Sequence, residues 1–184
     1  MPGPSGYRRF PAVPPVSSEL TVQNLGADDR PVIHAWPLYG PPFEALNYAI
    51  RPGGWLDEQG RVPGCIALGG SAEGALVAFS LLVPAGAQGA EFFVAVKSGI
   101  IQKGIGRRMT EATLRHGFLG AGLHRIFLKV RVNHAVGRHL YASVGFCECG
   151  SKTEEINGLP VDFIMMEIRQ DQWRARHSVA EQPR

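Results

Sequence analysis

The chain has 184 residues, of which 45% are hydrophobic and 19% are charged. This composition is typical of a globular protein with a packed core and excludes an intrinsically disordered chain. The net charge of +3 is too small to indicate a nucleic-acid partner, and no apolar run approaches the roughly 20 residues that span a bilayer. We therefore expect one domain with no nucleic-acid or membrane partner.

The predicted domain is flanked by two tails. Residues 1–17 contain five prolines, which fix the backbone torsion φ and remove hydrogen-bond donors, so we expect a flexible tail there. Residues 170–184 are polar and predict a second tail, and Trp173 is placed to anchor its start to the body. A single domain over 18–169 lies between them.

Within that domain, strand and helix signals alternate, which indicates an α/β fold. The expected elements, in chain order, are a strand over 19–25, helices over 26–36 and 42–50, a loop over 52–58, strands over 65–68, 75–83 and 90–97, a helix over 104–119, a strand over 125–132, a helix over 135–144, and strands over 146–150 and 159–168. Turn residues predict hairpins at 71–74 and 157–158. The apolar face of the 104–119 helix, which we expect to be buried, comprises Ile105, Met109, Ala112 and Leu119.

The three cysteines, Cys65, Cys147 and Cys149, predict neither a disulfide framework nor a metal centre. Their number is odd, and Cys147-x-Cys149 has no second pair and no histidine at metal-ligand spacing. No apolar segment follows the basic pair Arg8–Arg9, so no secretory signal is visible. We expect free, buried thiols in a reducing cytoplasm and no metal site.

A glycine-rich loop between a strand and a helix is the segment that indicates chemistry. Gly104 and Gly106 lie where the helix begins, and glycine lets a ligand approach the backbone closely. The first turn of a helix offers unpaired N–H groups and a positive dipole end, which suit a phosphate. Lys103, Arg107 and Arg108 add positive charge beside them. The loop is a candidate pyrophosphate site, with a plain turn as the alternative.

Two common phosphate motifs fit this loop less well. A P-loop requires Gly-x-x-x-x-Gly-Lys-Ser/Thr, and a dinucleotide fingerprint requires Gly-x-Gly-x-x-Gly in the first strand–helix unit. Here Met109 stands where the third glycine belongs, and the loop lies in the middle of the chain. Neither ATP nor NAD is therefore the expected ligand.

Two sequence blocks follow one another at a characteristic spacing. The first is the strand at 90–96 with the loop Ile101-Gln-Lys-Gly-Ile-Gly, and the second, over 127–146, contains Leu140-Tyr141 followed by Gly145-Phe146. Together they resemble the GCN5-related N-acetyltransferase (GNAT) family, whose signature is a strand, then Arg/Gln-x-x-Gly-x-Gly/Ala, then a helix. Ile101 departs from this pattern, because it replaces the arginine or glutamine.

The resemblance implies a fold and a co-substrate. It implies a mixed, mostly antiparallel sheet with helices on both faces, in which one parallel strand pair splays apart and holds acetyl-coenzyme A. The backbone of Val94 and Val96 would then pair with pantetheine. The family's usual asparagine falls at His134, next to Asn133, so these two are candidate coenzyme A contacts, with a helix cap at Asn133 as the alternative. The N–H groups expected around the pyrophosphate are those of Gln102, Lys103, Gly104, Ile105, Gly106 and Arg107.

The resemblance also implies two catalytic roles. Tyr141 matches the family's usual general acid, which protonates the thiolate of coenzyme A after a deprotonated amine attacks the thioester. Glu91 lies on the strand that lines the site, where the family often places a carboxylate that acts as general base, sometimes through water. From the residues alone, the alternatives are a tyrosine packed under the Gly145-Phe146 turn and a solvent-facing edge glutamate.

The expected activity is transfer of an acetyl group from acetyl-coenzyme A to a primary amine of a small molecule or peptide. The resemblance implies that the acceptor meets residues 36–55 and 152–159. The first of these segments holds many aromatic and few acidic residues, which argues against a polycation, with a purely structural role of the aromatic residues in the core as the alternative. A non-catalytic module that senses coenzyme A and docks on a partner protein is the alternative, because Ile101 departs from the motif. A free strand edge near the last hairpin is compatible with a homodimer.

Overall fold

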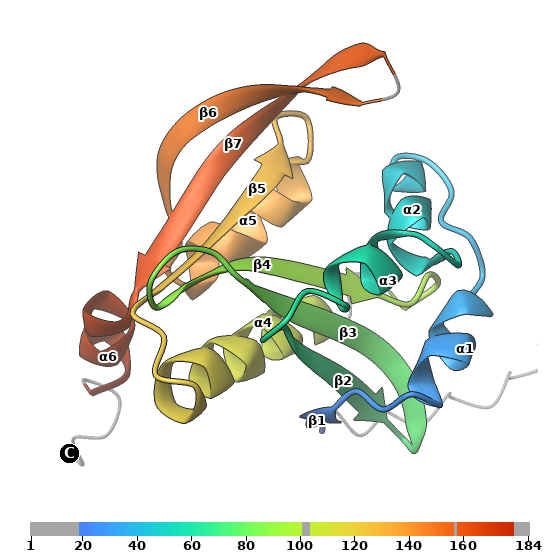
Figure 1. Cartoon of the computed structure of the whole chain (residues 1–184), viewed down its shortest axis with the longest axis horizontal. Helices are drawn as coiled ribbons and strands as arrows, with labels where there is room; N and C mark the ends of the chain where they lie inside the picture. Colours follow the sequence, from blue (N-terminus) through green and yellow to red (C-terminus); the bar gives the residue numbers. More distant parts are fainter. Residues whose placement is uncertain (1–18, 101–103, 157, 179–184) are drawn as a thin grey trace, which may run out of the picture.

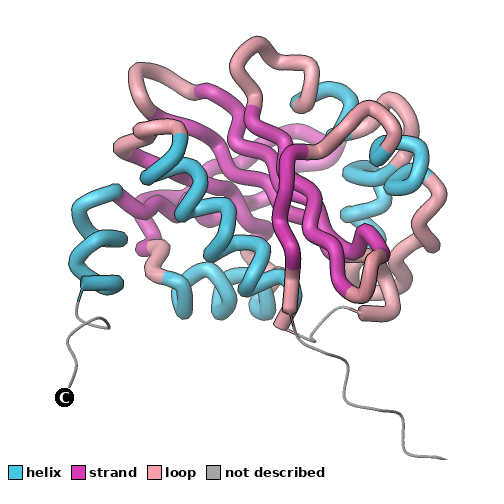
Figure 2. Tube along the Cα trace, turned by 90° about the horizontal axis from the view of Figure 1, so that it is seen from below, coloured by secondary structure: helices cyan, strands magenta, loops and turns pink. Residues whose placement is uncertain are grey.

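The computed structural model describes residues 19–100, 104–156 and 158–178, which form a twisted sheet with helices on both of its faces (Figure 1, Figure 2). The strands are β1 (Thr21–Asn24), β2 (Ile66–Ala72), β3 (Ala75–Pro84), β4 (Gly89–Val96), β5 (Arg125–Arg131), β6 (Cys147–Ile156) and β7 (Leu159–Arg169). The α-helices are α1 (Asp29–His34), α2 (Asn47–Ile50), α3 (Trp55–Gln59), α4 (Ile105–Arg115), α5 (Ala135–Val144) and α6 (Gln170–Ser178). A 3-10 turn, η1 (Glu44–Leu46), precedes α2, and a π-helical turn, η2 (His116–Gly120), continues α4.

The strand order in the sheet is β1-β2-β3-β4-β5-β7-β6. All neighbouring strands are antiparallel except β4 and β5, which are parallel. The predicted fold class, a mixed and mostly antiparallel sheet with one parallel pair, is confirmed.

The middle of the sheet is apolar where helices cover both faces. In β3, every residue from Val77 to Val83 is buried, as expected for a strand between two helical layers. In β5, Ile126, Leu128 and Val130 are buried and the residues between them are partly exposed. The second face of β5 therefore carries polar side chains, Lys129 among them.

The two helical layers form separate cores. Leu114 of α4 and Trp173 of α6 belong to one core, whereas Ile33 of α1 belongs to the other. Successive side chains of a strand point to opposite faces of a sheet. Accordingly, Phe92 of β4 lies in the core of α4, α5 and α6, and Phe93 lies in the core of α1, α2 and α3.

Two strands are longer than predicted. β2 continues to Ala72, which pairs with Ala75 across a two-residue turn, and β6 continues to Ile156. Ile156 pairs with Leu159, so the two strands are joined in register up to the predicted turn. Residue 157 itself lies outside the described residues.

Residues 55–59 form helix α3 and not the predicted loop. The helix has only five residues, so the apolar period of a helix does not repeat often enough to be visible in the sequence. Its Asp57 is buried and accepts hydrogen bonds from the Gly53 N–H at 2.8 Å and from Arg30 Nη1 at 3.1 Å. This carboxylate ties α3 to α1 across the layer that covers β3 and β4.

The π-helical turn η2 explains why Leu119 is exposed, against the prediction. A π-helical turn takes more residues than an α-helical turn, so the side chains after it rotate relative to the helix before it. Phe118 is consequently buried, and Leu119 is 54% exposed. Met109, in the regular part of α4, is buried as predicted.

The structure of the C-terminal part of the chain differs from a further prediction. Residues 170–178, predicted as the start of a tail, form α6. Trp173 is buried, as expected of an anchor, and its ring centroid lies 5.6 Å from that of Phe118. The predicted tail at 1–17 lies outside the described residues, and the limits of the domain stay a prediction.

The cysteines are free thiols, but only Cys65 is partly buried. Cys147 and Cys149 are exposed, which corrects the prediction of buried thiols, because β6 is the edge strand of the sheet. Within the described ranges, no helix has the length and apolarity needed to cross a membrane. The same ranges contain no group of three or more side chains suited to holding a metal ion.

Candidate active site

The parallel strands β4 and β5 separate after three residue pairs (Figure 1). β4 continues to Val96 along β3, and β5 continues to Arg131 along β7, but within these described strands no pairing joins them beyond Glu91 and Phe127. We call the region between residues 92–96 of β4 and 128–131 of β5 the strand gap. The splayed pair that the sequence predicted is therefore present.

The backbone of Val94 and Val96 faces the strand gap. The N–H of Lys97 donates to the carbonyl oxygen of Val77 in β3 at 2.8 Å, so Lys97 directs its backbone groups toward β3. Adjacent residues of an antiparallel strand direct these groups to opposite edges. Val96 and Val94 therefore direct theirs away from β3, as their predicted role requires.

The hydroxyl of Tyr39 is hydrogen-bonded to one of these backbone groups. Its hydroxyl donates to the carbonyl oxygen of Val96 at 2.8 Å, and its side chain is buried. Burial raises the pKa of Tyr39 far above the ordinary value, so the hydroxyl stays protonated and remains a donor. In the sequence, Tyr39 is one of the many aromatic residues of 36–55, and nothing local indicates a partner that is 57 positions away.

The first turn of α4 lies next to the gap and is built around two glycines. Gly104 precedes the helix with φ of 77°, a left-handed conformation that favours glycine. A Cβ on Gly106 would lie 3.3 Å from Leu140 Cδ1 of α5 and 3.5 Å from Val96 Cγ2, so glycine lets α4 pack closely there. The first helical bond runs from the Arg108 N–H to the Gly104 carbonyl, which leaves the N–H groups of the preceding turn free of helical partners.

The predicted positive charges around this turn have different partners. Arg107 Nε donates to Glu111 Oε1 at 2.9 Å, and Arg107 Nη1 donates to Ser143 Oγ at 3.4 Å. Its guanidinium is therefore engaged along the helix, whereas Arg108 Nη2 lies 3.8 Å from the position of a Cβ on Gly104. Gln102 and Lys103 lie outside the described residues.

Tyr141 of α5 packs against aromatic rings of the sheet. Its ring is edge-on to Phe92, with 6.3 Å between centroids, and to Phe146, with 5.9 Å. Among the described residues, no hydrogen bond engages its hydroxyl. Burial raises the pKa of Tyr141 to about 12, so the phenol is a neutral proton donor at physiological pH.

Glu91 lies on the opposite face of the sheet, at the last paired position before the strand gap. It precedes Phe92, which packs against Tyr141, so strand alternation directs Glu91 to the other side. Burial raises the pKa of Glu91, and the ammonium of Lys129, 3.9 Å away, opposes that shift. Glu91 therefore lies where the strand gap begins, beside an ammonium group.

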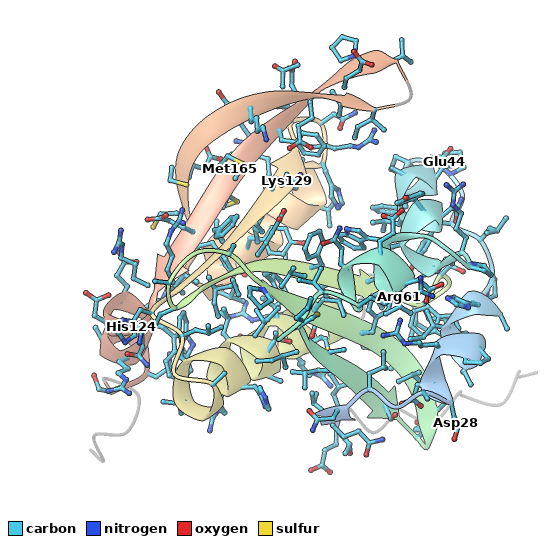
Figure 3. All side chains as sticks on the ribbon, in the orientation of Figure 1. Asp28, Glu44, Arg61, His124, Lys129 and Met165 are labelled. Carbon is cyan, nitrogen blue, oxygen red and sulfur yellow. The ribbon has the colours of Figure 1, made fainter. Side chains whose placement is uncertain are left out.

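Lys129 connects Glu91 to the last hairpin. Its Nζ donates to both carboxylate oxygens of Glu154 at 2.8 Å, and Lys152 Nζ lies 3.0 Å from the same carboxylate. These bonds hold the pKa of Glu154 below its usual range. In Figure 3, Lys129 is labelled beside Met165, its partner in the pairing of β5 with β7. Lys129 lies in the predicted strand over 125–132, and no local pattern in the sequence indicates its contact with Glu154.

His134 and Asn133 lie at the start of α5. The ring of His134 is edge-on to Phe43, with 5.7 Å between centroids, and a Cβ on Gly137 would lie 2.8 Å from its Cδ2. Burial lowers the pKa of His134, so the ring is neutral at physiological pH. Asn133 is exposed, and it does not cap α5. The capping position is held by His134, whose side chain makes no cap hydrogen bond.

Comparison with known sequences identifies the family. The family model described as "Acetyltransferase (GNAT) family" matches residues 32–146, more than half of the chain. This chain belongs to the GNAT acetyltransferase family. The match includes β4, β5, α4 and α5, which together surround the strand gap. The resemblance stated from the two sequence blocks is confirmed.

A curated relative extends the comparison over part of the chain. The spermidine N(1)-acetyltransferase of Vibrio cholerae serotype O1 is 35% identical over 89 residues, which are 47% of this chain and 51% of that protein. This GNAT chain thus spans about half the length of the curated relative that it matches.

Solved structures share the fold over most of the chain. The crystal structure of the spermidine/spermine N-acetyltransferase SpeG from Vibrio cholerae with manganese ions has a TM-score of 0.68 and 25% identity, covering 86% of this chain and 97% of that one. A GNAT-family acetyltransferase from Streptococcus pneumoniae has a TM-score of 0.63 and 17% identity, covering 82% and 99%. At that identity, the second likeness shows the fold alone.

Proposed function

We propose that this protein is an N-acetyltransferase that moves an acetyl group from acetyl-coenzyme A to a primary amine by direct attack. The observation that carries the proposal is the position of Glu91 and Tyr141 on opposite faces of the sheet, where β4 and β5 separate. An amine and a thioester that meet in the strand gap would have a carboxylate on one side and a phenol on the other. Proton removal from the nucleophile and proton delivery to the leaving group need that arrangement.

The surroundings of the strand gap suit acetyl-coenzyme A. Gly104 places no side chain over the first turn of α4, which supports phosphate binding by the N–H groups of Ile105, Gly106 and Arg107. The outward backbone of Val94 supports hydrogen bonds to the amides of pantetheine. When bound, the co-substrate supplies an activated acetyl thioester.

Glu91 and Tyr141 then divide the proton transfers. Glu91 takes the proton of the acceptor ammonium, directly or through a water molecule, so that the neutral nitrogen attacks the carbonyl carbon. As the C–N bond forms and the C–S bond breaks, Tyr141 gives its proton to the sulphur, and the second proton that the nitrogen loses as the amide forms returns to Tyr141 through water. Burial makes Tyr141 a weaker acid, but it also makes a thiolate beside it a stronger base. The proton transfer between them is therefore less unfavourable than the raised pKa of Tyr141 alone implies.

The remaining predicted contacts with coenzyme A have narrower roles in this proposal. Because the Val96 carbonyl already accepts the Tyr39 hydroxyl, only the N–H of Val96 is left for pantetheine. Asn133 and His134 lie at the start of α5, the helix that carries Tyr141, and their contact with coenzyme A stays a prediction. So do the contacts of Gln102 and Lys103.

We also propose that the protein forms a homodimer through β6. This strand is at the edge of the sheet, and its residues Cys147–Thr153 are exposed. An unpaired strand edge is a template for pairing with another chain. A structure of similar fold is described as a dodecameric spermidine N-acetyltransferase from Vibrio cholerae. Light scattering at micromolar concentration should give twice the chain mass or more, and a monomer mass would contradict the proposal.

The activity is tested by the release of free thiol from acetyl-coenzyme A with a panel of primary amines, beside calorimetric binding of acetyl-coenzyme A. We expect binding without any amine and thiol release that depends on the amine. Binding with no thiol release for any amine would instead favour the non-catalytic, coenzyme A-sensing module.

The pyrophosphate site is tested by Gly104→Val. A valine would strain the backbone and cover the first turn of α4, so we expect the Kd for acetyl-coenzyme A to rise at least tenfold, about 1.4 kcal/mol. Gly74→Val is the matched control, because Gly74 has the same φ of 77° in the β2–β3 turn, with open space around it. Equal Kd values for the two variants would contradict the assignment.

A further inference from the structure

The face of the strand gap that carries Glu91 already holds an ammonium group. Lys129 Nζ binds both carboxylate oxygens of Glu154 at 2.8 Å and lies 3.9 Å from Glu91 Oε1. The side chain passes over the ring of Phe163, whose centroid is 5.7 Å from Nζ. All three charged side chains are less than 30% exposed, so they are partly buried in this face and are not freely solvated surface charges.

The other acidic side chains near this face are also engaged. Asp57 is bound by Arg30 and by the Gly53 N–H, and Glu58 accepts the hydroxyl of Tyr48. Over the described part of 36–58 and 152–159, the acidic residues without an ion-pair or hydrogen-bond partner are Glu44 and Glu155, both exposed. Among these residues, the carboxylates without a cationic partner are the exposed Glu44, Glu58 and Glu155, and none of them is as buried as Glu91 or Glu154.

This charge balance bears on which amines the face accepts. Glu91 and Glu154 carry two negative charges when ionised, and Lys129 and Lys152 carry two positive charges. A polyamine has several ammonium groups and needs several uncompensated carboxylates along its length. Its second ammonium would have to displace Lys129 from Glu154 or lie close to a like charge, which is unfavourable.

The remainder of the same face is aromatic. Trp55 is edge-on to Phe93 with 4.2 Å between ring centroids, and Phe93 follows Glu91 by two positions, so both side chains lie on one face of β4. Phe43 is partly buried against the same core. Phe93 itself is buried, so only the partly exposed rings of Trp55 and Phe43 can meet a ligand, and they suit the flat apolar body of an amine better than a second charge.

We infer that the acceptor is a monoamine with an apolar, aromatic body, and that Lys129 excludes polyamines from the site by occupying the carboxylates that a second ammonium would need. The inference rests on the proposed function. It separates this chain from the relatives described as spermidine acetyltransferases, with which it shares the fold and the family.

Kinetic discrimination tests the role of Lys129 directly. With phenethylamine and spermidine as acceptors, we expect wild-type kcat/KM to be at least tenfold higher for phenethylamine. Lys129→Met removes the internal ammonium and should lower this ratio at least tenfold. Lys129→Arg keeps the charge and should keep the preference. A wild-type preference for spermidine, or an unchanged ratio in Lys129→Met, would overturn the inference.

Spermidine binding supplies a readout that does not depend on turnover. By calorimetry, we expect Lys129→Met to bind spermidine at least tenfold more tightly than wild type. Lys152→Met should give a smaller gain, because Lys152 is 60% exposed and contacts Glu154 alone among these carboxylates. If no amine is acetylated, the proposed function fails, and the order of these affinities still decides the inference: equal affinities in wild type and Lys129→Met contradict it.

Discussion

The two faces of the strand gap hold their reactive groups in opposite surroundings. Tyr141 lies among the rings of Phe92 and Phe146, and burial alone raises its pKa, to about 12. Glu91 lies on the other face, where burial raises its pKa and the charge of Lys129 opposes the shift. Apolar packing therefore keeps the phenol protonated, whereas a neighbouring ammonium favours the ionised carboxylate. One strand provides both environments, because consecutive residues of β4 point to opposite faces.

Removing the hydroxyl of Tyr141 from the apolar face should have the largest effect on activity. Tyr141→Phe keeps the ring and its contacts, so the melting temperature should change little. If Tyr141 protonates the leaving thiolate, kcat should fall about 10²-fold while the Kd for acetyl-coenzyme A is nearly unchanged. Thiol-release kinetics and calorimetry measure the two quantities. Wild-type kcat in the variant would show that Tyr141 is a packing residue only.

Removing the carboxylate from the charged face should have a smaller effect. Glu91→Gln should lower kcat/KM about tenfold near neutral pH, below the roughly 10²–10⁴-fold typical of general bases, because a fraction of the amine is already deprotonated. The loss should shrink as the pH approaches the pKa of the amine, where no base is needed. A deficit that is constant with pH would indicate a structural role for Glu91.

A finer test changes only the charge beside the base. Because Lys129 lowers the pKa of Glu91, its removal in Lys129→Met should raise that pKa. A base works when deprotonated, so the acidic limb of the kcat/KM profile should move to higher pH. Phenethylamine is a suitable acceptor for this titration. An acidic limb that stays in place, or moves to lower pH, would show that Glu91 is not the group whose titration sets it.

The smallest expected effect concerns stability at alkaline pH. The pKa of Tyr141 is raised from 10.0 to about 12 on folding, so its contribution to stability is fully present below pH 10 and is lost as the pH rises toward 12. Between these values, wild type should lose unfolding free energy relative to Tyr141→Phe. Urea titrations of both proteins at several pH values measure the difference. Parallel curves would contradict the burial of the phenol.

The sequence predicted the parts of the site that depend on local spacing. Gly104 and Tyr141 belong to short motifs, whereas the outward backbone of Val94 was expected only from the resemblance to the GNAT family. The sequence did not predict the contacts of Tyr39 with Val96 or of Lys129 with Glu154, which lie 57 and 25 positions apart. Such pairs depend on how the layers and the last hairpin pack, and no local pattern encodes them.

The errors in the fold have a similar cause. Helix α3 has five residues, too few for a helical period to appear, and the π-helical turn η2 changes the period of α4 in its last turn. The helix over 170–178 was hidden because its residues are polar, with Trp173 as the buried exception. Short elements and changes of period are set by tertiary packing and not by propensity alone.

The central claim is that the acetyl thioester lies in the strand gap, between Glu91 and Tyr141. A crystal structure with bound coenzyme A tests it most directly. We expect the pantetheine chain between β4 and β5, bonded to the backbone of Val94, with its sulphur within hydrogen-bond distance of the Tyr141 hydroxyl. Coenzyme A bound outside the strand gap would contradict the account. So would a sulphur that lies beyond hydrogen-bond distance of the Tyr141 hydroxyl, or a gap that closes between Tyr141 and Glu91.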